Sequence, residues 1–104
     1  MRLRSLNVFH HGRVPEGCRD LGSSQLLARL EGDNLLVGEF RESDGREAAV
    51  VVNKDLARST AFGLEFRQAG TVTLVSPYSG AEAAWGGEQC WLAPGQGMLL
   101  LRGR

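Results

Sequence analysis

Short apolar segments separated by glycine-containing turns run along the whole chain, and this pattern restricts it to β-structure. Glycine accounts for 14 of the 104 residues, and many of these glycines lie between apolar segments. Turn signals recur about every 8 to 12 residues, a spacing typical of an antiparallel sandwich or barrel. We therefore predict an all-β fold, an antiparallel β-sandwich of eight or nine short strands, that occupies residues 1–104 as a single domain.

The patterns of individual segments predict where some of the strands lie in the sandwich. In Thr60–Phe66, strict alternation puts Phe62, Leu64 and Phe66 on one face. The run Ala48–Val52 is apolar without alternation, which suits a strand that is central in its sheet or covered on both faces. The expected strands are Leu3–His10, Gln25–Leu30, Leu35–Phe40, Ala48–Val52, Thr60–Phe66, Val72–Leu74, Ala81–Trp85, Glu88–Leu92 and Met98–Leu101.

Two pairs of neighbouring segments are expected to form β-hairpins. The turn Glu31–Asn34 separates two short apolar segments, and the Gly-Gly pair at 86–87 separates two others. Both turns contain residues that accept the backbone angles of tight hairpin turns. Gln25–Leu30 also has the apolar spacing of a short helix that Ser23 or Ser24 would cap, but its length favours the strand.

The balance of charges and the length of the apolar runs indicate which classes of partner we do not expect for this chain. Twelve basic residues balance twelve acidic ones, so we expect no nucleic-acid partner. The apolar runs are far too short to span a membrane, and the pattern of the first residues leads us to expect no secretory signal. Met1–Leu6 leads directly into strand-like sequence, so we expect a fragment of a larger protein. Cys18 and Cys90 are too few for a disulfide framework, and either one bridge or two thiols is compatible with the sequence.

The candidate catalytic and metal-binding residues do not form a recognisable constellation in the sequence. His10 and His11 are adjacent, so a strand would point them to opposite faces and away from a shared ion. Cys18 has no local feature that would activate its thiol. Glu39 lies within an apolar segment, and we interpret it as a strand residue paired with a neighbouring arginine. We therefore predict no catalytic residue, no metal ligand, no cofactor and no enzyme activity for this chain alone.

Three aromatic residues near the second expected hairpin are the candidates for a contact surface. Trp85, Trp91 and Tyr78 lie close together in the sequence. A row of rings on a β-sheet stacks against the apolar faces of sugars. Large aromatic side chains are more often buried in a core or an interface, and we favour that interpretation here.

Five segments together form a pattern that spans nearly the whole chain. They are Val8–Gly17, Leu35–Phe40, Asp44–Arg46, Ala49–Asp55 and Leu92–Leu101. This pattern resembles the C-terminal β-sandwich domains that follow the (β/α)8 catalytic barrel of many glycoside hydrolases. In those enzymes the catalytic carboxylates lie on the barrel, so the resemblance implies an accessory role. Such a domain packs on the barrel, stabilises it and helps to shape one edge of the substrate cleft.

Two functional hypotheses follow, and they predict different surfaces. The first is a non-catalytic accessory domain of a glycoside hydrolase-like protein, whose partner is the catalytic barrel of the parent chain. It predicts an exposed apolar patch of the kind that marks an interaction surface. The alternative is a carbohydrate-binding module that uses Trp85, Trp91 or Tyr78, and it predicts a row of solvent-exposed rings.

Overall fold

The computed structural model describes residues 3–12, 24–43, 45–68, 70–76, 79–87 and 89–103, and in these ranges the chain is all-β. The predicted fold class is confirmed, and each strand lies within two residues of a predicted segment. The predicted loop Val14–Gly17 and Cys18 lie outside the described residues. The nine strands are β1 (Leu3–Gly12), β2 (Leu27–Glu31), β3 (Asn34–Glu42), β4 (Glu47–Asn53), β5 (Thr60–Phe66), β6 (Val72–Val75), β7 (Glu82–Trp85), β8 (Cys90–Leu92) and β9 (Gly97–Arg102).

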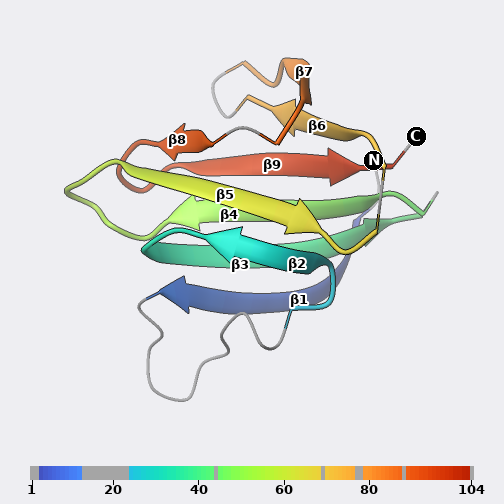
Figure 1. Cartoon of the computed structure of the whole chain (residues 1–104), viewed down its shortest axis with the longest axis horizontal. Coiled ribbons are helices and arrows are strands. Elements are labelled where there is room, and N and C mark those ends of the chain that lie inside the picture. Colours follow the sequence, from blue (N-terminus) through green and yellow to red (C-terminus); the bar gives the residue numbers. More distant parts are fainter. Residues whose placement is uncertain are drawn as a thin grey trace.

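The strands form two antiparallel sheets of unequal width. The larger sheet has six strands in the order β1-β3-β4-β9-β6-β7, and the smaller has three in the order β2-β5-β8. In Figure 1 the small sheet lies in front of the large one, whereas β6 and β7 extend beyond it at the top. The prediction that Ala48–Val52 is central is confirmed, because β4 pairs with β3 on one side and β9 on the other. The difference in width leaves part of the large sheet without a covering strand.

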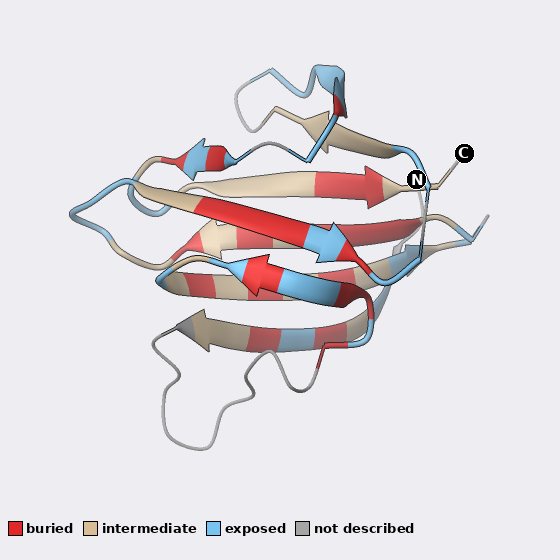
Figure 2. Cartoon of the chain, in the orientation of Figure 1, coloured by how far each residue is buried: buried red, intermediate tan, exposed pale blue. Residues whose placement is uncertain are grey.

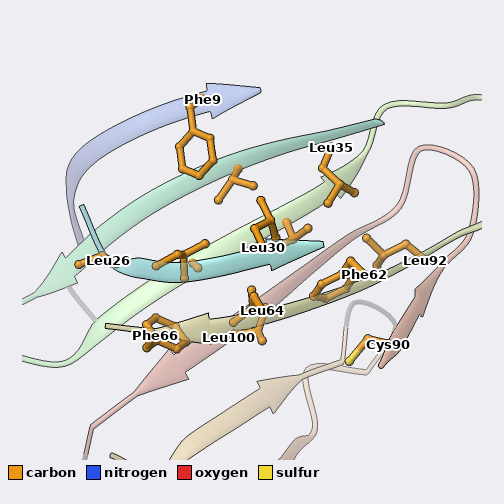
Figure 3. Close-up of a cluster of buried hydrophobic side chains, with 14 of the residues drawn as sticks. Phe9, Leu26, Leu30, Leu35, Phe62, Leu64, Phe66, Cys90, Leu92 and Leu100 are labelled. Atoms are coloured by element: carbon orange, nitrogen blue, oxygen red, sulfur yellow. The ribbon is translucent and has the colours of Figure 1, made fainter. Parts of the chain in front are cut away.

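The core lies between the two sheets and follows the alternation of each strand. Along β3 every second residue from Leu35 to Glu39 is buried, and Figure 2 shows the resulting bands. Phe62, Leu64 and Phe66 are all buried, so the predicted inward face of β5 is confirmed. Figure 3 shows these side chains in one cluster with Phe9 and Leu100 of the large sheet. Contact between the two inner faces is what removes the apolar surface from water and stabilises the sandwich.

The first expected hairpin is wrong, because its two strands belong to different sheets. β2 pairs with β5, whereas β3 pairs with β1 and β4. Gly32 permits the crossing, since its φ is 156° and a Cβ at this position would overlap Leu35 Cδ1. Crossing between sheets lets both strands bury their apolar side chains in one core. A hairpin in a single sheet would add no strand to the opposite layer.

The second expected hairpin is also wrong for the same reason. β7 pairs with β6, with Val72 opposite Trp85, and β8 pairs with β5, with Phe62 opposite Cys90. The segment after Trp85 therefore crosses from the large sheet to the small one. β8 supplies the small sheet with its third strand and buries Cys90 and Leu92 in the core.

Asn53 joins the end of β4 to two neighbouring loops. It is fully buried, and its Nδ2 donates to the carbonyls of Arg58 (2.8 Å) and Ala93 (3.2 Å). Its Oδ1 accepts from the Asp55 N–H at 3.0 Å. Backbone groups that strand pairing leaves without partners at this end of the sandwich are thereby satisfied by one side chain.

Candidate functional site

The three aromatic candidates do not form a row in the described structure. Trp85 is only 9% exposed and packs in the core, whereas Trp91 is 66% exposed on the edge strand β8. The two tryptophans belong to different sheets, and Tyr78 lies outside the described residues. The preference for burial is confirmed for Trp85. Trp91 is the candidate that the structure places on the surface.

Trp91 forms one wall of an apolar groove where the small sheet ends. Leu74 of β6 and Met98 of β9 line the groove and pack against the core cluster. Ala83 of β7 adds to this apolar lining, and the groove has a volume of about 360 Å³. The groove exists because β8 is the last strand of the small sheet, so the inner face of β6 and β7 continues past it. Trp85 fills another part of that uncovered face.

A second apolar surface lies on the side of the large sheet that faces away from the core. The strand register places residues of neighbouring strands in rows, and one row runs Val8, Gly38, Val50, Leu99 and Val75. These residues alternate with inward-facing core residues, so they point to the opposite side. We call this surface the outer apolar face, and it consists of Val8, Leu36, Phe40, Val50, Val52, Val75, Leu99 and Leu101.

The composition of the outer apolar face is unusual for a sheet side turned away from the core. The row through Val50 contains no charged residue until it reaches Glu82 on the edge strand β7. All nine described strands belong to the two sheets, so no third layer of described strands covers this face. Val8 is 52% exposed, Leu101 is buried, and the other members are partly buried. The Phe40 ring lies so close to Gly38 that a Cβ there would approach it to 2.9 Å.

Glu39 is the most deeply buried carboxylate of the described structure, and the prediction that an arginine pairs with it is wrong. The side chain is fully buried on the inner face of β3. Its Oε1 accepts from Asn7 Nδ2 at 3.0 Å and from the Gln25 N–H at 2.9 Å. Its Oε2 accepts from Ser24 Oγ at 2.6 Å and from the Leu26 N–H at 3.0 Å. Four neutral donors therefore satisfy the carboxylate in place of a cation.

These hydrogen bonds give Glu39 a structural task. The donors at residues 24–26 lie directly before β2, so the carboxylate of β3 fixes the start of the small sheet against the large one. Sequence pattern alone contains a signal for this burial, because Glu39 has the same parity as the buried Leu35 and Val37. The sequence contains no comparable signal for which residues donate to Glu39, since Asn7 lies 32 residues before it in the chain.

A second buried carboxylate, Glu47, does have arginine partners. Its Oε1 accepts from Arg102 Nε at 2.6 Å, and its Oε2 accepts from Arg41 at 3.2 Å. Arg102 is largely buried, whereas more than half of the Arg41 side chain is exposed. The carboxylate therefore joins the ends of β3, β4 and β9, and we assign it to the structure of the sheet.

The remaining sequence candidates are placed as follows. His10 Nδ1 lies 2.8 Å from Lys54 Nζ, on the outer side of the large sheet. Cys90 is a buried thiol. Within the described ranges, no group of three or more His, Cys, Asp or Glu residues is arranged to hold a metal ion. The same ranges contain no helix long and apolar enough to cross a membrane.

The chain was also compared with known proteins. Models of protein families, curated proteins and solved structures gave no match to it.

Proposed function

We propose that this chain is a non-catalytic accessory domain of a glycoside hydrolase-like protein, and that it packs against a catalytic (β/α)8 barrel. The outer apolar face carries the proposal. An apolar sheet side that no described strand covers has an unfavourable contact with water where its side chains are exposed, and a neighbouring domain removes that contact. A sheet covered on both sides is also the arrangement that a non-alternating apolar strand such as β4 suits best.

The resemblance and the outer apolar face arise from the same segments. Leu35–Phe40, Ala49–Asp55 and Leu92–Leu101 contain most of β3, β4 and β9, which are neighbours in the large sheet. Every member of the face except Val8 and Val75 comes from these three strands. The segments that resemble hydrolase-associated domains are thus the ones that build the surface available for docking.

The surroundings of the two buried carboxylates, Glu39 and Glu47, favour a structural role for this chain rather than a catalytic one. A catalytic acid must reach a substrate, whereas both oxygens of Glu39 are occupied by buried donors. Glu47 is held between two arginines in the same way. We therefore assign no catalytic residue to this chain, and the proposal places the chemistry on the barrel.

The first test is the coding sequence that precedes this chain. The proposal expects an in-frame (β/α)8 barrel with two carboxylates at strand ends, and a reading frame without such a barrel would overturn it. The second test uses that longer protein with a protease site inserted between its two parts. After cleavage, the barrel and this chain should elute together from a sizing column.

Matched charge substitutions identify the surface that holds the two parts together. Val50→Lys places a charge at the centre of the outer apolar face and should separate the parts after cleavage. Ala28→Lys places the same charge on the exposed side of β2 and should leave them together. Separation of the unmodified parts, or equal behaviour of both variants, would contradict docking through this face.

The carbohydrate-binding module remains the second candidate, and one observation favours it. Trp91 is exposed beside an apolar groove, so a ring is available for stacking. Trp85 is buried and contributes no exposed ring, so the candidate rests on Trp91.

A further inference from the structure

We infer that the groove at Trp91 is a binding site for one neutral hexopyranose unit of an oligosaccharide, which stacks on the Trp91 indole. The inference does not depend on the barrel, because Trp91 lies on the small sheet and the other apolar residues that carry it, Leu74, Ala83 and Met98, lie outside the outer apolar face. Among its described lining residues, the groove shares only Val75 with that face. It also differs from a module with a row of rings, since one ring and one groove define a single subsite.

The position of Trp91 is the first argument. The neighbouring Cys90 and Leu92 hold β8 in the core, so alternation turns Trp91 away from the core. A single exposed apolar residue on a surface needs no explanation. Trp91 differs because it lines a groove together with Leu74, Ala83 and Met98, so apolar surface continues from this residue into the hollow.

The shape and chemistry of the groove suit a sugar ring. Its volume of about 360 Å³ lies near the lower end for ligand pockets, which fits one sugar unit rather than a long chain. The C–H face of a pyranose is apolar and packs on an indole, while the hydroxyls at its edge need polar partners. Ser76 and Gln96 are the uncharged polar residues in the lining. Gln96 Oε1 accepts from the Ala93 N–H at 2.9 Å, which fixes the carboxamide and leaves its amino group as a donor.

The charge of the lining selects among sugars. Glu82 is the only charged residue among the described ones that line the groove. A carboxylate repels anionic ligands, and none of the described lining residues is a lysine or arginine that would offset that repulsion. A neutral hexose is therefore expected to bind, whereas a uronic acid at the same position is not.

The experiment is an NMR titration of the whole chain with maltotriose, cellotriose and trigalacturonic acid. At least one neutral trisaccharide should bind with a Kd of about 1 mM or below, a range typical of one small subsite. The shifted resonances should include the Trp91 indole N–H and residues on β6 and β7 beside the groove. Trigalacturonic acid should produce no saturable shift.

Three variants locate the binding. Trp91→Ala should weaken binding about tenfold or more, since it removes the stacking surface. Ala83→Leu keeps the indole but fills part of the groove, and it should weaken binding as well. Leu56→Ala removes another highly exposed apolar side chain outside the groove and should bind as the wild type does.

Several results would overturn the inference. The first is the absence of saturable shifts with both neutral trisaccharides at about 10 mM. The second is binding of trigalacturonic acid with the same affinity as a neutral trisaccharide. The third is an unchanged affinity of folded Trp91→Ala or folded Ala83→Leu. Shifts confined to the outer apolar face would also overturn it. Because none of these variants alters that face, co-elution with a barrel is tested separately and either proposal can fail alone.

Discussion

Replacement of Glu39 by glutamine tests whether this carboxylate fixes the two sheets together. Glutamine has the same shape, but only one of its two terminal groups accepts hydrogen bonds. If its oxygen takes the place of Oε1, the bonds from Asn7 and the Gln25 N–H are retained. Its amino group then faces Ser24 Oγ and the Leu26 N–H, both of which are donors in the native structure.

The cost follows from counting these groups. Ser24 Oγ can rotate to accept, but the Leu26 N–H cannot, and a buried donor without a partner costs about 1 to 3 kcal/mol. The two retained bonds lose the assistance of the negative charge, which removes roughly another 1 kcal/mol. We therefore expect Glu39→Gln to lower the free energy of unfolding by about 2 to 4 kcal/mol, against a total of about 5 to 15 kcal/mol for an ordinary domain.

Urea denaturation followed by tryptophan fluorescence measures this loss, because unfolding exposes the buried Trp85 to water. The midpoint should fall by roughly 1 to 2 M urea, because the slope for a small domain is about 2 kcal/mol per M. Glu65→Gln is the matched control, since Glu65 is an exposed carboxylate on β5, and it should change stability by less than about 0.5 kcal/mol. A Glu39→Gln midpoint equal to that of the control would refute the role assigned to the four hydrogen bonds.

Four further substitutions test the assignments of buried and exposed residues. Val51→Asp places an unpaired charge in the core and should abolish cooperative unfolding; an unchanged melting temperature would contradict the placement of β4. Trp85→Ala should lower the free energy of unfolding, measured by urea denaturation, by about 3 to 5 kcal/mol, whereas Trp91→Ala should lower it by less than about 0.5 kcal/mol. Equal losses in the two variants would contradict the burial of Trp85 and the exposure of Trp91. Asn53→Ala should lower the free energy of unfolding by about 2 to 3 kcal/mol, because the backbone groups that Asn53 binds lose their partner. A loss below about 0.5 kcal/mol would contradict the role of Asn53 in satisfying these groups.

Local pattern in the sequence was sufficient to locate strands but not to assign them to sheets. Alternation in Thr60–Phe66 identifies the inward face of β5 because the side-chain period belongs to the strand itself. The turns at 31–34 and 86–87 identify changes of direction in the same way. Whether such a turn returns to its own sheet or crosses to the other depends on which edge is available elsewhere, and β5 offers its edges to β2 and β8.

For the candidate site, too, local pattern predicted some features, whereas others depend on how the two sheets are arranged. The sequence indicated that tryptophans near the end of the chain are the residues to test, and the structure separates them by burial. The groove could not be predicted, because it results from a small sheet that has fewer strands than the large one. The partners of Glu39 were missed because Asn7 and Ser24 are distant in the sequence and have no charge that would suggest the pairing.

The most direct test of the accessory-domain proposal is the accessibility of the outer apolar face in the longer protein. Val50→Cys gives a thiol at the centre of that face, and Ala28→Cys gives one on the exposed side of β2. Labelling with a maleimide is measured in the isolated chain and in the barrel-containing protein, with the reactivity of the native cysteines subtracted. The proposal predicts that Val50→Cys reacts more slowly in the longer protein while Ala28→Cys does not change. Equal reaction of Val50→Cys in both proteins would contradict docking of the barrel on this face.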